Sequence, residues 1–585
     1  MEKRRLQFIL LLVVGAVVWS AFAWGYMPGV VERAYRGESI SYFNNLLDYR
    51  HVNPLEFYMA KWYRLAGGLL ALWLGAGVLL LATTTQRFAR FIGSATPGTL
   101  GAMRVLVCLI LIYSVWDAKT RTVASLLESQ RRSMGVMDWI YAAPFGFDQL
   151  VRSDTGLVIF KGATILALAL AAIGWKTRLL VPIAALLYLA HGGIIRSHYW
   201  FFHNGLIPWY VLAAMCFMRC GDGFSIDRIL RVRRGKTVPP ADVAVPYYAW
   251  CRYVCWILVI MPYVAAGMSK LGNGTIYWWH GVNMQSILYT QALLHPFTGA
   301  DASFMLRHPE LPTWFYSLLG IGTIFSEIGM ILILVSHRAR MILPAAAAAL
   351  HLGIKYLMGI WFWDLVWIQL LFYNWRPVRI WAMNRLRRGG EIIANTVDHS
   401  AAAASGLRRF AGPVVVTLVP VFLLSLWARR VEYYPLTSMQ MFSTYDNSGL
   451  VTYYRVYHTN ETGETREAPL AEMGIGRPHY WGLLIDAFET DPGREKLVEI
   501  LQHVGTSWNG VAEQGQRVVR FEVHKRQWDF VRSRLDQALG DTVEQFAVDL
   551  PATFAIEQDM GEDEQIIDEL IDDLTEATDE TWENT

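Results

Sequence analysis

Charged residues are scarce in this chain. Asp, Glu, Lys and Arg together make up 17% of its 585 residues, whereas average globular proteins carry about 25%. Hydrophobic residues reach 54% and aromatic residues 13%. So little charge over so long a chain indicates an integral membrane protein, which contacts membrane lipid and has no nucleic acid as a partner.

Cysteine is also rare, and its placement excludes two kinds of site. No Cys-x-x-Cys occurs, the soluble C-terminal region has no cysteine, and all five cysteines lie in or beside apolar segments (Cys108, Cys216, Cys220, Cys251 and Cys255). Neither a disulfide framework nor a zinc site is therefore indicated, and no metal site is predicted. The sequence also lacks an internal repeat, which disfavours a transporter built from inverted repeats.

Long apolar segments predict the membrane fold. A helix needs about 20 apolar residues to cross a bilayer. Clusters of Lys and Arg follow the second, fourth, sixth, eighth and tenth segments, and such clusters favour the cytoplasmic side. We therefore predict an all-α polytopic protein of the cytoplasmic (inner) membrane, with its N-terminus in the cytoplasm. Its transmembrane helices, about eleven in number, are expected at approximately residues 6–28, 64–83, 101–116, 156–175, 179–195, 205–218, 247–270, 314–335, 341–358, 360–373 and 410–427.

The polar C-terminal region predicts a small extracytoplasmic α+β domain. Residues 450–456 and 518–523 have the composition of strands, and Asn460-Glu-Thr-Gly463 is typical of a hairpin turn. Helices are predicted at residues 480–489, 494–504 and 525–539. The predicted parts are two extra N-terminal helices with an outer loop (1–97), the main transmembrane domain (98–428), the α+β domain (429–556) and an acidic disordered tail (557–585).

Ionisable side chains within the apolar segments are the candidate functional residues, because a charge inside a bilayer is costly. The predicted topology puts His203 and Lys270 at the outer face, so a partly buried pocket facing outward is geometrically possible. A desolvated lysine in such a pocket can lose its proton and act as a base. The candidates are His203, Lys270, Glu327, His351, Lys355 and Asp364.

Each of these residues also has a purely structural interpretation. Lys270 ends an apolar helix shortly before Trp278, so its side chain can instead snorkel to water at the bilayer surface. His351 can hydrogen-bond between helices, and Glu327 can pair with a basic residue that joins two helices. Asp364 can lie near the membrane interface. The residues alone leave these alternatives open.

Four motifs in order, followed by a fifth stretch, carry a family resemblance. In chain order, the four motifs are Phe202-His203-Asn204 with Ser225-Ile-Asp227, then Tyr263-Val-Ala-Ala-Gly267-Met-Ser-Lys270-Leu271 with Trp279 and Gly281, then Glu327, and then His351. The fifth stretch is Tyr434–Met441, after the last apolar segment. At these residues the sequence resembles vitamin K-dependent gamma-glutamyl carboxylase and its bacterial relatives with the HTTM domain. The resemblance covers about residues 98–467.

The resemblance implies a membrane enzyme, a carboxylase-like lyase or a quinol-epoxidising monooxygenase. Such an enzyme oxidises a reduced vitamin K-type quinone with O2 and so generates a base that removes a carbon-bound proton. Lys270 would deprotonate the quinol, and His203 would orient or stabilise the resulting oxyanion. Carboxylation by CO2 of a protein or peptide substrate at the outer face is left open. The supporting pocket residues would be His351, Glu327, Asn204 and Tyr263.

The alternative is a non-catalytic membrane module. It would bind quinone or lipid, or act as a scaffold through its outer domain and acidic tail. Geometry distinguishes the two hypotheses. Convergence of Lys270, His203 and His351 on one cavity favours the enzyme, whereas a Lys270 that points to bulk water favours the module.

Overall fold

The computed structural model describes most of the chain. The described residues are 2–36, 54–83, 88 and 92–550, the last range with gaps at 125, 128, 130, 132–134, 144–145, 198–202, 204, 237, 240–242, 295–310, 375–407, 471, 474–477, 514 and 533–539. The predicted acidic tail at 557–585 and the candidate Asn204 therefore lie outside the described residues. The chain divides into two units, Met1–Tyr453 with Gln527–Gly540, and Tyr454–Arg526 with Asp541–Thr585.

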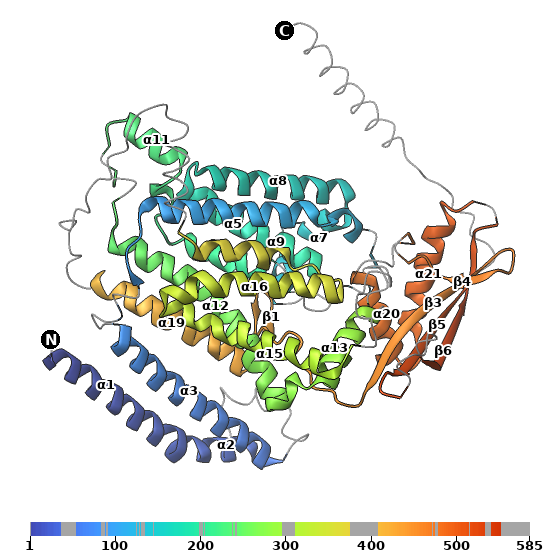
Figure 1. Ribbon diagram of the computed structural model, residues 1–585, viewed down its shortest axis with the longest axis horizontal. Helices are drawn as coiled ribbons and strands as arrows, with labels where there is room; N and C mark the ends of the chain where they lie inside the picture. The colour runs from blue at the N-terminus through green and yellow to red at the C-terminus, as the bar shows by residue number, and fades with distance from the viewer. Residues whose placement is uncertain are drawn as a thin grey trace, which may run out of the picture. The chain divides into compact units, whose positions relative to one another are not determined.

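The first unit is mostly helical, and every predicted apolar segment contains a helix (Figure 1). Within the described residues, eight helices are long and apolar enough to cross a membrane, and Leu206–Met215, Trp363–Phe372 and Gly412–Ala428 are shorter apolar helices. The main helices are α1 (Glu2–Ser20), α2 (Met27–Tyr35), α3 (Leu55–Thr83), α5 (Pro97–Asp117), α8 (Asp154–Ile173), α9 (Thr177–Arg196), α10 (Leu206–Met215), α12 (Pro246–Gly274), α15 (Thr313–Gly329), α16 (His337–Met358), α17 (Trp363–Trp367) and α19 (Arg408–Ala428).

Shorter helices connect these segments or extend them. A π-helix, η1 (Ala21–Tyr26), joins α1 to α2. The others are η3 (Thr120–Val123), α6 (Val136–Ala142), α7 (Phe147–Arg152), η5 (Cys220–Asp222), α11 (Ile226–Arg233), η6 (Thr275–Trp279), α13 (Gly281–Leu294), η9 (Met330–Leu334) and η10 (Ile368–Phe372).

Local sequence explains where several helices begin. Thr96 and Thr99 form a reciprocal capping box at the start of α5, with Pro97 in the first turn, where a missing N–H costs nothing. Asp227 caps α9 from a distance, because its carboxylate accepts the backbone N–H groups of Lys176 and Thr177, both at 2.7 Å. These contacts determine where α5 and α9 begin.

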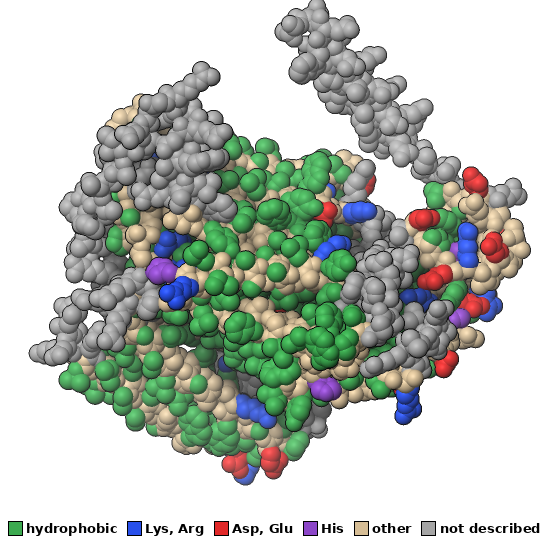
Figure 2. Space-filling model, in the orientation of Figure 1, with side chains coloured by type: hydrophobic (Ala, Val, Ile, Leu, Met, Phe, Trp, Pro, Cys, Tyr) green, Lys and Arg blue, Asp and Glu red, His purple; other side chains and the backbone are tan. Residues whose placement is uncertain are grey.

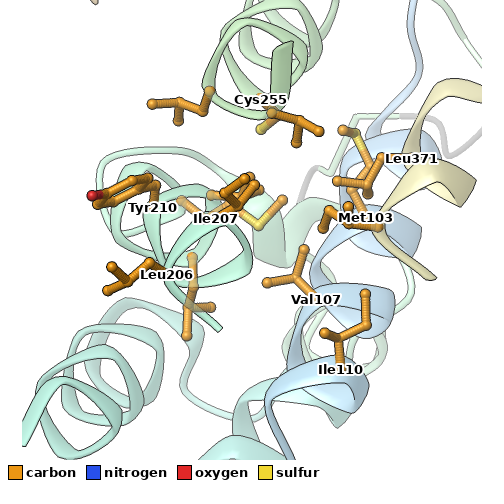
Figure 3. Close-up of a cluster of buried hydrophobic side chains, with 14 of the residues drawn as sticks. Met103, Val107, Ile110, Leu206, Ile207, Tyr210, Cys255 and Leu371 are labelled. Atoms are coloured by element: carbon orange, nitrogen blue, oxygen red, sulfur yellow. The ribbon is translucent and has the colours of Figure 1, made fainter. Parts of the chain in front are cut away.

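The core of the first unit lies between α5, α10, α12 and η10 (Figure 3). Aliphatic side chains of α5 face Leu206, Ile207 and Tyr210 of α10, while Cys255 and Leu371 approach from α12 and η10. Of the eight long apolar helices, α12 is the most enclosed. Of its apolar stretch of 18 residues, 83% are buried, whereas the fraction is 11% in the stretches that contain α1 and α3. Apolar side chains also cover much of the visible outer face of these helices (Figure 2), as expected for helices that face lipid.

A segment after the last helix lies among the helices of the first unit. We define it as the inner segment, Glu432–Asp446; it begins with the antiparallel strands β1 (Glu432–Tyr433) and β2 (Leu436–Thr437). The Tyr434 side chain is buried, and its hydroxyl donates to the Leu189 carbonyl at 2.7 Å. Residues 432–453, predicted from the sequence as part of the outer domain, group with the helical unit.

The second unit holds most of a four-stranded sheet and two helices. The strand order is β4-β3-β5-β6, and β3 pairs antiparallel with β4 in the register His458 to Arg466. Gly463 closes the predicted hairpin with a φ of +82°, which favours glycine. The elements are β3 (Leu450–Asn460), β4 (Thr465–Glu467), α20 (Pro478–Thr490), α21 (Glu495–Asn509), β5 (Val518–Asp529) and β6 (Asp541–Asp549).

The predicted strands, the hairpin turn and the first two helices of this region are confirmed, but the helix predicted at 525–539 is wrong at its start. Strand β5 continues to Asp529, and 533–539 lie outside the described residues. The polar run after Val523 has no strand-like alternation, yet the strand carries Trp528 into a buried aromatic cluster, 5.0 Å from the Tyr289 ring. Packing of this one large side chain overrides the local pattern.

Candidate functional site

Lys270 lies one turn before the end of α12 and is buried, with 2% of its surface exposed. Its Nζ donates to Glu327 Oε1 of α15 at 2.9 Å and to the Met441 carbonyl of the inner segment at 3.0 Å. The ammonium also lies 5.4 Å from the centroid of the Trp278 ring. Lys270 therefore does not snorkel to water, and of the two interpretations of Glu327, pairing with a basic residue is what the geometry shows.

Gly267, one turn before Lys270, explains how α12 and α15 come so close. A Cβ at this position would lie 2.6 Å from Ile328 Cγ1 and 3.2 Å from Glu327 Cβ. Only a residue without a side chain fits there, as in other close helix contacts in membranes. The small residue thus positions Glu327 within reach of Lys270.

A second polar group surrounds Tyr263, two turns before Lys270 on α12. The Gln369 side-chain amide donates to the Tyr263 hydroxyl at 2.8 Å, and the hydroxyl lies 2.8 Å from His351 Nε2. The hydroxyl proton finds an acceptor in the tautomer in which His351 Nε2 accepts and Nδ1 carries the imidazole N–H, and we assign this tautomer to His351. Gln369 was not among the sequence candidates; an amide within the apolar segment 360–373 was the signal that could have found it.

Three buried atoms of these two groups have no hydrogen-bond partner in the described structure. They are Glu327 Oε2, His351 Nδ1 and Gln369 Oε1, two acceptors and one donor. The two groups are close enough to interact electrostatically, since the Lys270 charge acts on His351 and that of Glu327 on Tyr263. Buried polar atoms are nearly always paired, so the cluster has unused capacity to bind a polar ligand or water.

His203 lies before α10 and contacts the inner segment. Its Nε2 is 3.0 Å from Thr437 Oγ1. Burial lowers the pKa of the His203 imidazole to about 3, so the ring is neutral near pH 7. Asp364 accepts the N–H of Gly205 at 2.8 Å through Oδ2 and so holds the turn that follows His203. Asp364 itself is buried within the protein, with 2% of its surface exposed.

The predicted residues do not all line one cavity. A narrow hollow between α10, α12, α19 and the inner segment is lined by Tyr210, Met261, Pro262, Ala265, Leu423, Leu424, Thr437, Ser438 and Met439. His203 contacts its wall through Thr437, whereas Lys270 and His351 are not lining residues. Lys355 is exposed, with its Nζ 5.2 Å from the Trp361 ring.

The inner segment is what connects these parts. It contacts His203 through Thr437, accepts from Lys270 at Met441 and accepts from Trp278 Nε1 at the Phe442 carbonyl, 3.2 Å away. The Asn273 amide also donates to Ser443 Oγ at 3.1 Å. Backbone carbonyls of a loop leave no signature in the sequence, so only the fold identifies Met441 and Phe442 as contacts of the site.

Among the residues that the structure describes, no group of His, Cys, Asp or Glu could hold a metal ion. Comparison of the chain with protein-family models, curated proteins and solved structures found no match. The class of protein therefore follows from its own fold: a mostly helical protein with apolar helices long enough to cross a membrane and a small sheet region near its C-terminus.

Proposed function

We propose that this chain is a multi-pass inner-membrane enzyme of the vitamin K-dependent carboxylase-like kind, which oxidises a reduced quinone with O2. The observation that carries the proposal is the buried Lys270–Glu327 pair, with Glu327 Oε2 unpartnered beside the Tyr263–His351–Gln369 group. A buried ion pair is a weak device for stability. Ionisable groups within apolar segments are instead characteristic of functional sites.

The unpartnered atoms fit a reduced quinone. Glu327 Oε2 and Gln369 Oε1 can accept from its hydroxyl groups, and the His351 Nδ1–H can donate to an oxygen. When bound, a reduced quinone would supply all four electrons that O2 takes up, two from oxidation of the quinol to the quinone level and two from the ring double bond, so that one oxygen atom enters the ring as an epoxide and the other leaves as water. The neighbouring Trp278 and Phe362 supply aromatic surface.

Lys270 acts as the base after passing its own proton to Glu327. In a dry interior, the neutral pair of amine and carboxylic acid competes with the ion pair, because desolvation penalises both charges. The neutral Nζ then accepts a proton from a substrate hydroxyl. The Met441 carbonyl keeps the amine oriented in both protonation states, since it accepts from either.

His203 is a neutral group that orients or stabilises an oxyanion from the side of Thr437. Its low pKa keeps it uncharged, so it acts by hydrogen bonding and not as a permanent cation. The Tyr263 hydroxyl hydrogen-bonds to both Gln369 and His351, so these three side chains hold one another in place. Asn204 would be a further supporting group at this end.

The proposal includes a membrane topology. In it, the eight long apolar helices and the three shorter ones would all be spans, eleven in total. An odd number would put the N-terminus and the sheet-containing unit on opposite sides of the membrane, and the Lys and Arg clusters after the even-numbered segments favour a cytoplasmic N-terminus. The sheet-containing unit would then lie outside, where a protein or peptide substrate would be presented. Addition of CO2 to that substrate is the step that the proposal leaves to experiment.

The test uses the purified full-length chain in nanodiscs, supplied with a reduced menaquinone-type quinone and O2. Quinone epoxide is measured by mass spectrometry. Lys270→Ala should abolish epoxide formation. The matched control is Lys161→Ala, because Lys161 also lies within an apolar helix but donates only to backbone carbonyls, Trp116 at 2.9 Å and Ala118 at 2.8 Å. Epoxide formation that survives Lys270→Ala rejects the assigned role.

The second candidate is a module that binds quinone or lipid without turnover. It is favoured by the separation between the hollow and Lys270, since a ligand in the hollow would touch Thr437 and Ser438 but not the lysine. The same preparation distinguishes it. Stoichiometric quinone that stays bound to the wild-type chain and to Lys270→Ala alike, with no epoxide formed by either, supports the module.

A further inference from the structure

Helix α11 and the turn to Lys236 present a fixed outward face at one end of the helical unit (Figure 1). The segment from Phe217 to Lys236 contains only two acidic residues, and both are engaged within the protein. Asp222 accepts the Tyr248 hydroxyl at 2.7 Å and pairs with Arg231 at 2.9 Å. Asp227 caps α9. The charge that this segment shows to its surroundings is therefore positive.

Two arginines attach α11 to the rest of the protein. Arg228 Nη1 donates to the Asp222 carbonyl at 2.7 Å, and Arg231 Nη2 donates to the Gly221 carbonyl at 2.8 Å. The Asp227 N–H also donates to the Gly174 carbonyl at 3.1 Å. With these bonds made, the opposite side of the helix has a defined orientation.

The outward face combines apolar and basic side chains. Ile229, Val232 and Arg233 follow the spacing i, i+3 and i+4, which places them on one side of α11. Lys236 follows the turn after the helix. Ile229 is 53% exposed and Val232 54%; Arg233 and Lys236 are also exposed. Phe224, just before the helix, is 47% exposed. Such a mixture is typical of helices that lie in a membrane interface.

The contacts of α11 with the turn between α8 and α9 determine its depth relative to the bilayer surface. Gly174 and Lys176 form the turn between α8 and α9, two helices long and apolar enough to cross a membrane. Such a turn lies at a bilayer surface, and Trp175, with the Lys176 Nζ 5.0 Å from its ring, has the composition of an interfacial anchor. Because Asp227 bonds directly to this turn, α11 lies at the same level.

We propose that the α11 face binds the headgroups of anionic phospholipids in the adjacent leaflet. Arg233, Arg234 and Lys236 contact the phosphates, and Ile229 and Val232 enter the acyl boundary. Charge complementarity selects this occupant, because the face carries three basic groups and no acidic one. The inference is independent of the quinone chemistry proposed above, since it concerns a surface that shares no residue with that site.

Amide hydrogen exchange of the full-length chain in nanodiscs tests this proposal. Nanodiscs of phosphatidylcholine are compared with nanodiscs that also contain phosphatidylglycerol. Exchange of residues 226–236 should slow by about ten-fold or more in the anionic discs, and the difference should shrink in high salt. Adding soluble glycerol phosphate to the neutral discs should not reproduce it, because a soluble anion is not held at the bilayer surface beside the basic groups.

The variant Arg233→Gln/Arg234→Gln/Lys236→Gln should lose the slowing in anionic discs, and Ile229→Ser/Val232→Ser should reduce it. The matched control Lys496→Gln/Arg517→Gln/Arg532→Gln removes the same charge from exposed positions elsewhere and should keep it. Equal exchange in neutral and anionic discs overturns the proposal. So does protection by soluble glycerol phosphate alone, which indicates a soluble anion site, or protection that requires an added protein fraction.

Discussion

Helices α12 and α1 are both long and apolar enough to cross a bilayer, but they are built for different surroundings. The apolar stretch of 18 residues in α12 has a mean hydropathy of 1.7, and 83% of it is buried. The corresponding stretch of the span that begins with α1 has a mean hydropathy of 2.3, and 11% of it is buried. The less hydrophobic helix is thus the more enclosed. In lipid, apolarity does not drive helices together, whereas close packing and hydrogen bonds do.

The difference lies in what each helix carries. Helix α12 presents Tyr263, Gly267 and Lys270 to its neighbours, three residues that bond or fit into α15, α16 and η10. Helix α1 contacts α3 through apolar packing, which is close at Gly15 and Gly77. Two indole hydrogen bonds also join them, from Trp73 to the Leu12 carbonyl at 3.1 Å and from Trp19 to the Ala66 carbonyl at 3.0 Å, but no ionisable side chain among the described residues joins the two helices. We therefore expect substitutions at the polar and closely packed positions of α12 to lower the free energy of unfolding far more than substitutions at exposed positions of the peripheral α1–α3 pair.

The largest effect is expected from Glu327→Ala. The change leaves the Lys270 ammonium buried without its carboxylate, and breaking a buried pair in this way costs about 3–5 kcal/mol. Thermal or denaturant unfolding in detergent measures the loss. Val14→Ala on the exposed side of α1 is the control and should change stability by less than about 0.5 kcal/mol. Equal effects of the two changes would remove the distinction between the helices.

Gly267→Ala should also separate the two regions. The new Cβ would press on Ile328 and on the Glu327 stem, and overpacking of this kind costs about 1–3 kcal/mol. Gly68→Ala in α3 meets nothing within 4 Å, so it should be neutral or slightly stabilising through helix propensity. The same unfolding measurement on both variants decides it; destabilisation by Gly68→Ala to the same degree would contradict the comparison.

Tyr263→Phe tests the hydrogen bonds alone, because the ring is kept. It leaves His351 Nε2 and the Gln369 amide without their shared partner, and unpaired buried groups cost about 1–3 kcal/mol. Tyr26→Phe in the exposed part of η1 is the matched control, since Tyr26 is 59% exposed. A stability loss no larger than that of the control would show that the Tyr263 hydroxyl is dispensable.

The last effect is confined to acidic pH and should leave stability at neutral pH unchanged. His203 has a folded-state pKa of about 3 because of burial, below its unfolded value of about 6.5. The unfolded state therefore takes up the proton first, so His203 contributes stability above pH 6.5 that is lost as pH falls towards 3. His203→Gln should flatten the unfolding free energy across this window relative to the wild type. An identical pH profile for both proteins would contradict the burial of this group.

Most of the helical architecture was predictable. Every apolar segment became a helix, because apolar length and the cost of unpaired backbone groups leave few other structures in a membrane. The hairpin at Gly463 and the strands around Val451 and Val518 followed from local turn and strand signals. Strand β5 was extended past its local pattern because Trp528 found a distant aromatic partner in Tyr289.

The candidate site was predictable in its ionisable residues but not in its connections. Lys270, Glu327 and His351 stand out in the sequence because charged or titratable groups are rare in apolar segments. Gln369 is less conspicuous, and the carbonyl contacts of the inner segment have no side-chain signature. His203 contacts Thr437 and Lys270 contacts Met441, two different residues of the inner segment. The placement of His203 relative to Lys270 therefore depends on how this segment folds.

The sequence by itself determined the membrane-compatible helices and the few polar groups inside them, since both depend on the composition of short segments. Whether Lys270 reaches water or a carboxylate was decided only by the tertiary structure. Gly267 lets α15 approach, and the inner segment covers the end of α12. These contacts join residues 57 and 171 positions away from Lys270, a distance that no local pattern encodes.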